Sequence, residues 1–310
     1  MVGIILGSIF GGLVLLILIF ALIFIIYIYS AVFKSPKKGQ NNEYRLESVL
    51  DLKGNEEKFI ELVKTMTSLP YESLYTTSYD GLKLHAYFYP KKDSNHYVLF
   101  FNGYRGIPRR DFAGKAIEIM KLNKNVILCN QRAHDKSEGH ALTLGRKEQY
   151  DVVSWVKFVK EKFGKDVKIT LYGISFGAAT VLFAADKIDS DVSIIADSPY
   201  SSEKDLVTHF MKLKKVPPKI FWPLTYLAAL LFCHARLKDD ALNTVSNSKC
   251  RTLIIHGTDD KIVPFEMSER LYLPNKDHVQ MAAFEGLDHA LGFIFEKEKY
   301  MKIIADFLNQ

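Results

Sequence analysis

Near its centre the chain reads Val167-Lys168-Ile169-Thr170-Leu171-Tyr172-Gly173-Ile174-Ser175-Phe176-Gly177. The first part of this stretch is a short apolar run typical of a buried strand, and Ala178 and Ala179 begin a helical pattern. Gly-x-Ser-x-Gly between a strand and a helix places the serine on a strained turn that projects its hydroxyl above the sheet. The glycines on either side allow the strand and the helix to approach closely. We therefore predict that Ser175 is a nucleophile.

Short strand-like runs alternate with helical stretches on both sides of this motif. Asp80-Gly81 joins two runs of period two, at residues 74–79 and 82–89, which predicts a hairpin. The other predicted strands are residues 97–101, 126–129, 167–172, 192–196, 252–256 and 279–284. The predicted helices are residues 46–68, 112–122, 146–163, 176–187, 265–272 and 292–308. Apolar strands alternating with helices predict an α/β fold, a mostly parallel eight-stranded sheet with helices on both faces.

Residues 199–249 interrupt this alternation and are too long for a simple crossover. The segment contains three prolines, at Pro217, Pro218 and Pro223. Its strongly apolar run, residues 224–232, is too short to span a bilayer. We expect a cap over a pocket for an apolar substrate group, with this run as a substrate wall. A buried insertion helix is the alternative.

The first 33 residues contain no charged side chain, and residues 4–29 are almost entirely Ile, Leu, Val and Phe. About 20 such residues cross the hydrocarbon core of a bilayer, so we expect residues 1–33 to be a transmembrane anchor. A cleaved signal peptide would have a basic start, a shorter apolar stretch and small residues at its end, and this segment has none of these. Tyr27 and Tyr29 stand where an interfacial aromatic belt would lie.

Flanking charge predicts the orientation of this anchor. Lys34, Lys37, Lys38 and Arg45 follow the apolar segment, which favours a cytoplasmic domain at the cell membrane and contact with anionic lipid. Residues 34–72 are interpreted as a linker and an N-terminal helical segment, and residues 73–310 as the main domain.

Composition limits the partners of the chain. The net charge of +6 comes from scattered Lys and Arg without a basic stripe, so no nucleic-acid partner is expected. Cys129, Cys233 and Cys250 have no CxxC spacing and predict buried free thiols. No metal and no cofactor are expected.

A nucleophilic serine needs a base, and in this type of triad the acid and then the histidine follow the serine in the chain. His289 lies in Gly286-Leu287-Asp288-His289, after the last predicted strand and before the last helix. That position is at the carboxyl edge of the sheet, where open α/β folds bind ligands. We therefore predict that His289 is the base.

Three aspartates are candidates for the acid that orients His289. Asp259 and Asp260 are adjacent in Gly257-Thr258-Asp259-Asp260-Lys261-Ile262-Val263-Pro264, and Asp197 ends another predicted strand. Asp260 is our choice, because Asp259 also suits a solvated turn or a cap. Triads are recognised by geometry, so the two alternatives stay open at this stage.

An oxyanion requires two preorganised backbone N–H donors. One is expected from Phe176, the residue after the nucleophile, and the other from the loop Asn102-Gly103-Tyr104-Arg105-Gly106. Tyr104 is the expected donor in that loop.

From about residue 74 to 308 the chain resembles the α/β-hydrolase superfamily. It is most similar to bacterial esterase/lipase-like and serine-aminopeptidase-like hydrolases with an N-terminal membrane anchor. The supporting motifs, in family order, are the 102–106 loop, Arg132-Ala133-His134-Asp135-Lys136-Ser137, the serine motif, and 257–264 with His289. The family form Gly-x-x-Asp-x-x-Val-Pro also implies Asp260.

The chain departs from the family pattern in two loops. Asn102 replaces the usual histidine of the oxyanion loop, and Asn130, Ala133 and Asp135 replace an aspartate and two glycines of the second motif. The replacement of the histidine by Asn102 leaves the oxyanion donor in place, because this donor is a backbone N–H group. The resemblance implies that Arg132, His134 and Ser137 brace the loops around the site.

These observations predict a membrane-anchored serine hydrolase that cleaves a small-molecule or lipid-like carboxylic ester through an acyl-enzyme on Ser175. A peptidase or an acyltransferase of the same fold is the alternative. A non-catalytic, membrane-tethered binding protein is a third hypothesis, although such proteins normally lose a triad residue.

Overall fold

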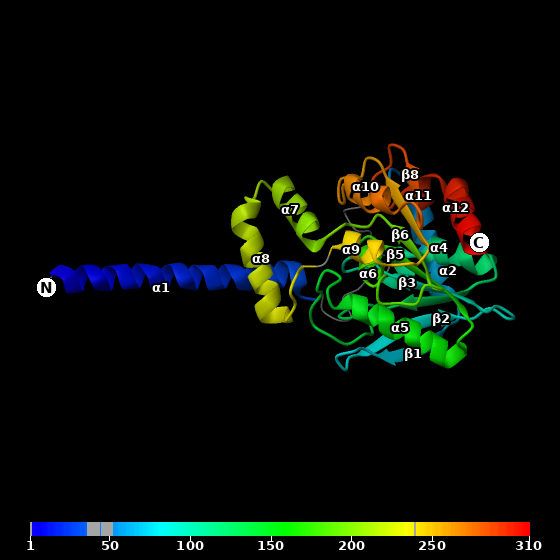
Figure 1. Ribbon diagram of the computed structural model, residues 1–310, viewed down its shortest axis with the longest axis horizontal. Coiled ribbons are helices and arrows are strands. Elements are labelled where there is room, and N and C mark those ends of the chain that lie inside the picture. The colour runs from blue at the N-terminus through cyan, green and yellow to red at the C-terminus, as the bar shows by residue number, and fades with distance from the viewer. Residues whose placement is uncertain (1, 36–43, 45–51, 239) are drawn as a thin grey trace.

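The structure is a computed structural model that describes residues 2–35, 44, 52–238 and 240–310 (Figure 1). Within these residues eight strands form one sheet, as predicted, and their order is β1-β2-β4-β3-β5-β6-β7-β8. β1 pairs with β2, and β2 with β4, in antiparallel register, while the other neighbours are parallel. The strands are β1 (Glu72–Thr77), β2 (Lys83–Tyr89), β3 (His96–Phe101), β4 (Asn125–Cys129), β5 (Lys168–Ile174), β6 (Ser193–Asp197), β7 (Thr252–Gly257) and β8 (Val279–Phe284).

The helices between these strands agree with the predicted pattern and differ at three places. The helices of the main domain are α2 (Glu56–Ser68), α3 (Pro108–Asp111), α4 (Ala113–Lys121), α5 (Glu148–Phe163), α6 (Phe176–Phe183), α10 (Glu266–Tyr272), α11 (Gly292–Phe295) and α12 (Lys297–Asn309), with the 3-10 turn η2 (Leu273–Asn275). α6 ends at Phe183 rather than at residue 187. The predicted last helix is two helices, because the backbone of Glu296 leaves the helical region. The first predicted helix, residues 46–68, begins at Glu56 in the structure, and its residues 46–51 lie outside the described residues.

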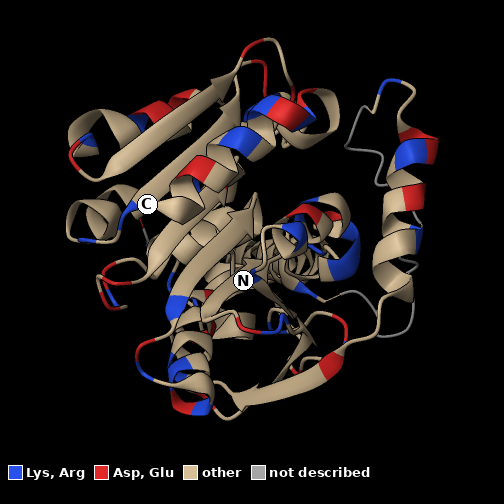
Figure 2. Cartoon of the chain, turned by 90° about the vertical axis from the view of Figure 1, so that its right-hand side faces the viewer, with Lys and Arg blue, Asp and Glu red and all other residues tan. Residues whose placement is uncertain are grey.

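Two apolar cores cover the two faces of the sheet. On one face α5 and α6 pack with Trp155 and Phe183 buried, and on the other α2, α4 and α12 pack with Phe112 and Tyr300 buried. The parallel strands in between are almost completely buried, which explains their continuous apolar sequence. In Figure 2 the charged residues lie mainly on helices and loops around the strands. Cys129, Cys233 and Cys250 are buried free thiols, as predicted.

The N-terminal segment forms α1 (Val2–Ile28), which continues as the short π-helix η1 (Tyr29–Phe33). It is long and apolar enough to cross a membrane. Its inner end is attached to the domain, since Leu142 N–H donates to the Phe33 carbonyl at 2.7 Å and Ser35 N–H to the His140 carbonyl at 3.0 Å. Lys37, Lys38 and Arg45, which carry most of the orientation argument, lie outside the described residues.

The insertion between β6 and β7 forms α7 (Glu203–Leu213), α8 (Pro218–Cys233) and α9 (Ala241–Ser246). α8 crosses α1 where that helix enters the domain (Figure 1). The rings of Phe24 and Phe221 lie 5.1 Å apart, and those of Tyr29 and Phe232 lie 4.9 Å apart. The expected substrate wall at residues 224–232 is therefore wrong in detail. Most of this run packs against α1 and η1, and only Thr225 of the run lines the cavity described below.

Candidate active site

Ser175 occupies the sharp turn between β5 and α6. Its backbone has φ 54° and ψ −113°, a strained conformation for a residue with a side chain. A Cβ at Gly173 would lie 2.2 Å from the Gly177 carbonyl oxygen, and one at Gly177 would lie 1.9 Å from the Phe101 carbonyl oxygen. Both glycines are therefore required by close backbone contact, and the turn has the geometry that the sequence predicts.

His289 and Asp260 meet beyond the carboxyl ends of β7 and β8. His289 Nδ1 lies 2.7 Å from Asp260 Oδ2. The other carboxylate oxygen accepts hydrogen bonds from the backbone N–H groups of Ile262 and Val263, both at 2.8 Å. Burial alone would raise the pKa of Asp260, but the neighbouring imidazoles of His289 and His256 outweigh burial and hold this pKa well below its usual range. Asp260 is thus held as a carboxylate.

A second histidine contacts the same carboxylate, and the sequence reasoning missed it. His256 is fully buried, with Nε2 2.9 Å from Asp260 Oδ2 and 2.9 Å from the Val263 carbonyl, and Nδ1 2.6 Å from Ser268 Oγ. Two acceptors at Nε2 assign the proton to that nitrogen, so Nδ1 accepts from Ser268. His256 lies at the end of β7, directly before the Gly-Thr-Asp-Asp motif. This position next to the motif is the sequence feature that could have indicated its contact with Asp260.

The two alternative acids have other environments. The buried Asp197 accepts hydrogen bonds from Lys115 Nζ at 2.9 Å and from the Tyr300 hydroxyl at 2.6 Å. Asp259 is exposed on the turn and contacts the hydroxyl of Thr258 at 3.4 Å. Of the three aspartates, Asp260 is the one that the structure brings to His289.

The loop after β3 lies beside the serine. A Cβ at Gly103 would lie 3.9 Å from Ser175 Cβ, and the Gly103 N–H donates to Asp111 Oδ2 at 3.1 Å. The next residue, Tyr104, lines the same cavity as Ser175 and Phe176. Phe176 is the first residue of α6, so its backbone N–H lies outside the hydrogen-bonding pattern of the helix.

The same loop also holds the end of the N-terminal helix. The Tyr104 hydroxyl donates to the Val32 carbonyl at 2.7 Å, and the Arg105 guanidinium donates to the carbonyls of Ala31 and Lys34, both at 3.0 Å. These carbonyls lie at a helix C-terminus, where they lack partners within the helix and favour a nearby cation. No sequence signal linked the two segments.

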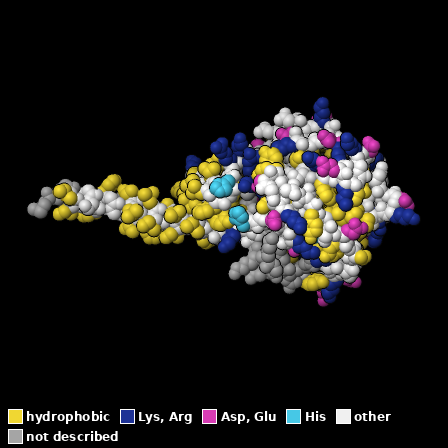
Figure 3. Space-filling model, turned by 90° about the horizontal axis from the view of Figure 1, so that it is seen from below, with side chains coloured by type: hydrophobic (Ala, Val, Ile, Leu, Met, Phe, Trp, Pro, Cys, Tyr) yellow, Lys and Arg dark blue, Asp and Glu magenta, His cyan; other side chains and the backbone are white. Residues whose placement is uncertain are grey.

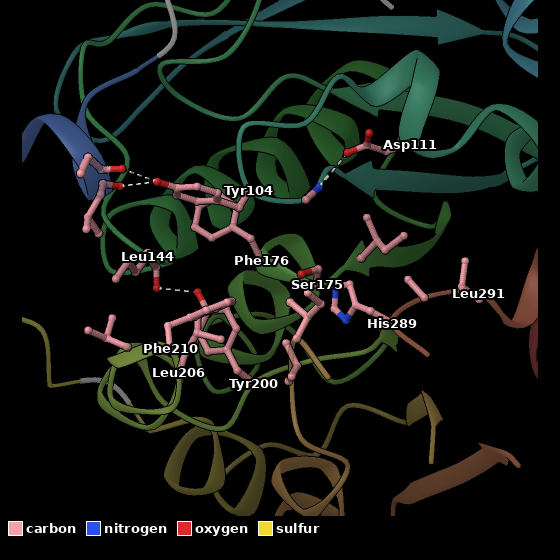
Figure 4. Close-up of a pocket in the computed structure, with 18 of the residues that line it drawn as sticks. Tyr104, Asp111, Leu144, Ser175, Phe176, Tyr200, Leu206, Phe210, His289 and Leu291 are labelled. Carbon is pink, nitrogen blue, oxygen red and sulfur yellow. Dashed lines mark hydrogen bonds between the residues drawn. The ribbon is translucent and has the colours of Figure 1, made fainter. Parts of the chain in front are cut away.

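Ser175 and His289 lie side by side on the wall of a cavity of about 660 Å³ (Figure 4). The lining is mainly apolar and comes from α1, α7 and the loop after β3, with Leu206 and Phe210 opposite Tyr104 and Phe176. Among the described residues no hydrogen bond joins Ser175 Oγ to His289. Such contacts are often long before substrate binds. Within the described residues, no group of three His, Cys, Asp or Glu side chains could hold a metal ion.

The second loop motif is buried beside the site. Arg132 donates to Asp151 at 2.6 and 2.7 Å and to Asp80 at 2.9 and 3.0 Å. His134 stacks on the ring of Phe176, and Ser137 donates to the Asn130 carbonyl at 2.7 Å. These contacts tie the loop to the hairpin, to α5 and to the residue after the nucleophile.

The order of strands, the strained serine turn and the position of His289 define the α/β-hydrolase fold. Solved structures with this fold resemble the chain. An esterase of Pyrococcus furiosus aligns with a TM-score of 0.65 at 23% identity, covering 79% of this chain and 92% of the esterase. An esterase of Exiguobacterium antarcticum aligns with a TM-score of 0.59 at 18% identity, covering 77% of this chain and all of the esterase.

Sequence comparison finds curated relatives at 25–28% identity. An uncharacterized Bacillus subtilis protein is 26% identical, with 61% of this chain and 64% of the relative aligned. A lysophosphatidylserine lipase of Danio rerio is 25% identical over 70% of this chain and 59% of the lipase. An uncharacterized membrane protein of Saccharomyces cerevisiae is 28% identical over 66% of this chain and 68% of that protein. The chain thus spans about 60% of the length of the first two relatives. No protein-family model matches the chain.

Proposed function

We propose that the chain is a membrane-anchored serine hydrolase that cleaves a carboxylic ester. The observation that carries this proposal is the convergence of Ser175 and the His289–Asp260 pair on one apolar cavity. Ser175 Oγ attacks the ester carbonyl carbon while His289 Nε2 takes the hydroxyl proton. The backbone N–H groups of Phe176 and Tyr104 stabilise the resulting oxyanion.

The tetrahedral intermediate collapses when the ester C–O bond breaks and the protonated His289 gives its proton to the departing alcohol. Water then attacks the acyl-enzyme with His289 as base, which releases the acid and restores Ser175. Asp260 accepts the Nδ1 proton of His289, which fixes the tautomer with a free Nε2, and stabilises the imidazolium that forms. The Gly103 N–H is held by Asp111, which leaves the Tyr104 N–H as the candidate second oxyanion donor.

The lining of the cavity favours an ester with a long apolar acyl group. The Danio rerio relative is a lysophosphatidylserine lipase, and we propose a lipid-like ester of this general kind for this chain as well. The apolar α1 would keep the enzyme near such substrates. The charge after the helix (Lys34, Lys37, Lys38, Arg45) favours a cytoplasmic domain at the cell membrane.

A fluorophosphonate probe tests the nucleophile. Wild-type protein should be labelled, and Ser175→Ala should not be. Ser154→Ala is the matched control, because Ser154 lies on α5 and donates only to the Tyr150 carbonyl of its own helix. Equal labelling of wild type and Ser175→Ala would refute the assignment.

Competing substrates test the bond that is cleaved. Long-chain esters and aminoacyl amides of matched size, offered together, should give ester hydrolysis in excess. Preferential amide cleavage would indicate the peptidase alternative. Acyl transfer to an added alcohol instead of water would indicate the acyltransferase.

A further inference from the structure

The part of α1 that projects from the domain matches the thickness of a bilayer. The side chains from Ile4 to Ile23 are almost all exposed, and from Phe24 onward the helix packs on the cap. Twenty helical residues are about 30 Å long, which matches the hydrocarbon core of a bilayer. If this stretch crosses the membrane, the cap lies at the lipid surface, without a spacer between them.

The cap presents an apolar helix at that surface. Figure 1 shows α8 lying across α1, on the side of the domain from which α1 projects. After Lys219, α8 contains no charged residue, although one face points away from the protein. That face includes Ile220, which is 62% exposed, and Leu231, which is 49% exposed, eleven residues or about three turns apart. An exposed apolar stripe of this kind marks an interaction surface.

The turn between α7 and α8 adds charge next to this stripe. The turn and the adjoining ends of α7 and α8 carry only positive charge, at Lys212, Lys214, Lys215 and Lys219, and all four residues are exposed. Figure 3 shows Lys and Arg side chains gathered where the hydrophobic helix meets the domain. Each such residue near an anionic lipid surface contributes about 1 kcal/mol of binding. An apolar stripe with adjacent lysines is the pattern of a helix that lies in the interface of an anionic bilayer.

The cavity opens beside this helix. Tyr27 of α1 is 65% exposed and Phe210 of α7 is 36% exposed, and both line the cavity that contains Ser175. Phe24, Ile28 and Ala31 of the N-terminal segment also line it. One wall of the candidate active site is therefore the inner end of α1.

We propose that α8 and the α7–α8 turn dock into an anionic leaflet, and that the ester substrate enters the cavity from this leaflet between α1 and α7. This proposal rests on the proposed function. It implies a substrate that resides in the bilayer and reaches Ser175 without crossing water.

The test compares two esters on the full chain reconstituted in vesicles of phosphatidylcholine and phosphatidylglycerol. One is 4-methylumbelliferyl oleate held in the bilayer, and the other is water-soluble p-nitrophenyl butyrate. The ratio of the two rates does not depend on the fraction of folded enzyme. Ile220→Glu/Leu231→Glu should lower this ratio at least tenfold, because two carboxylates on the apolar face oppose docking into an anionic leaflet. Neither residue lines the cavity, so hydrolysis of the soluble ester should not change. Leu273→Glu, at an equally exposed site 58% accessible on η2, should leave it unchanged. A double-variant ratio within twofold of wild type overturns the proposal.

A second measurement is independent of catalysis. The native cysteines are buried, so Ile220→Cys can be labelled selectively with an environment-sensitive fluorophore. Doxyl-labelled lipids should quench this fluorophore at position 220 and should not quench it on Leu273→Cys. If the wild type cleaves neither ester and resists the fluorophosphonate, the proposed function fails, while quenching still decides whether α8 docks. Equal quenching at positions 220 and 273 overturns the docking.

Discussion

Replacing Asp260 by asparagine should remove most of the activity while preserving the fold. Asp260 accepts four hydrogen bonds, two from backbone N–H groups and two from the imidazoles of His289 and His256. An amide keeps only one acceptor oxygen. Because the backbone donors are fixed, that oxygen faces Ile262 and Val263, and the amide NH₂ faces the two imidazoles.

This reversal acts directly on the base. With an NH₂ group opposite Nδ1, His289 becomes the acceptor there and carries its proton on Nε2, so it cannot take the proton of Ser175. The imidazolium that forms on His289 also loses its carboxylate partner, and a hydrogen bond to a charged group contributes about 1.5–3 kcal/mol. That loss alone corresponds to about 10- to 10²-fold in rate. The wrong tautomer adds to it, and the same change in a serine-protease triad costs about 10⁴ in kcat. We expect kcat to fall by about 10³ to 10⁴ with little change in KM.

The assay is steady-state hydrolysis of an ester, normalised to folded protein by thermal melting. Asp259→Asn is the matched control, since it changes the adjacent exposed aspartate, and its kcat should stay within twofold. Asp197→Asn should destabilise the protein through loss of the Lys115 pair. If Asp260→Asn keeps kcat within tenfold of wild type, or Asp259→Asn falls as far, the assignment of Asp260 is refuted.

Three further predictions concern the scaffold around the site. Gly177→Ala should abolish fluorophosphonate labelling and lower the yield of folded protein, since its Cβ would lie 1.9 Å from the Phe101 carbonyl oxygen. Lys115→Met should lower the free energy of unfolding by about 3–5 kcal/mol in denaturant titration, because it leaves the buried Asp197 carboxylate without its cation. Stability should fall from pH 6.5 toward pH 4, because burial lowers the pKa of both His85 and His96 to about 4. Between these pH values the unfolded state binds more protons than the folded state. The free energy of unfolding therefore falls by up to about 1.4 kcal/mol per pH unit for each histidine, which urea titrations at pH 7 and 4.5 would measure.

Each of these predictions has a control. Gly11→Ala should change neither fluorophosphonate labelling nor the yield of folded protein, because a Cβ there meets no atom within 4 Å. Lys121→Met removes only an exposed ion pair with Glu118 and should cost less than about 1 kcal/mol. His96→Gln should flatten the pH dependence. A Lys115→Met protein as stable as Lys121→Met, or stability that is constant from pH 7 to 4.5, would contradict the reasoning.

The sheet could be predicted from the sequence because its strands are buried on both faces. A run such as residues 167–172 has no other stable placement, and the glycines at 173 and 177 carry a steric requirement that is visible in the motif itself. Helix ends were less predictable. α6 stops at Phe183 although the apolar pattern continues to residue 185, and its C-cap is Ala184, so no glycine or other capping residue in the sequence marks this end.

The second partner of Asp260 shows a different limit. His256 and Asp260 are four residues apart, and the end of β7 and a tight turn bring them together. Because the segment is not helical, the i, i+4 spacing in the sequence does not indicate this contact. From the sequence, a histidine at the end of a buried strand can equally be interpreted as a core residue with no role in the site. Only the geometry shows that it donates to the carboxylate, and the low pKa of Asp260 follows from that contact and from His289.

The role of the N-terminal helix was the least accessible to sequence reasoning. Hydropathy identifies a segment that could cross a membrane, but it carries no information on what the inner end of that segment contacts. In the structure Tyr104 and Arg105 donate to carbonyls of residues more than 70 positions earlier, and they satisfy a helix end that would otherwise be unpaired. The loop that carries the candidate oxyanion donor is therefore fastened to the candidate anchor. A chain shortened to remove residues 1–33 would lose the contacts to Ala31 and Val32 and one wall of the cavity together, so the helix is part of the architecture of the site as well as a candidate anchor.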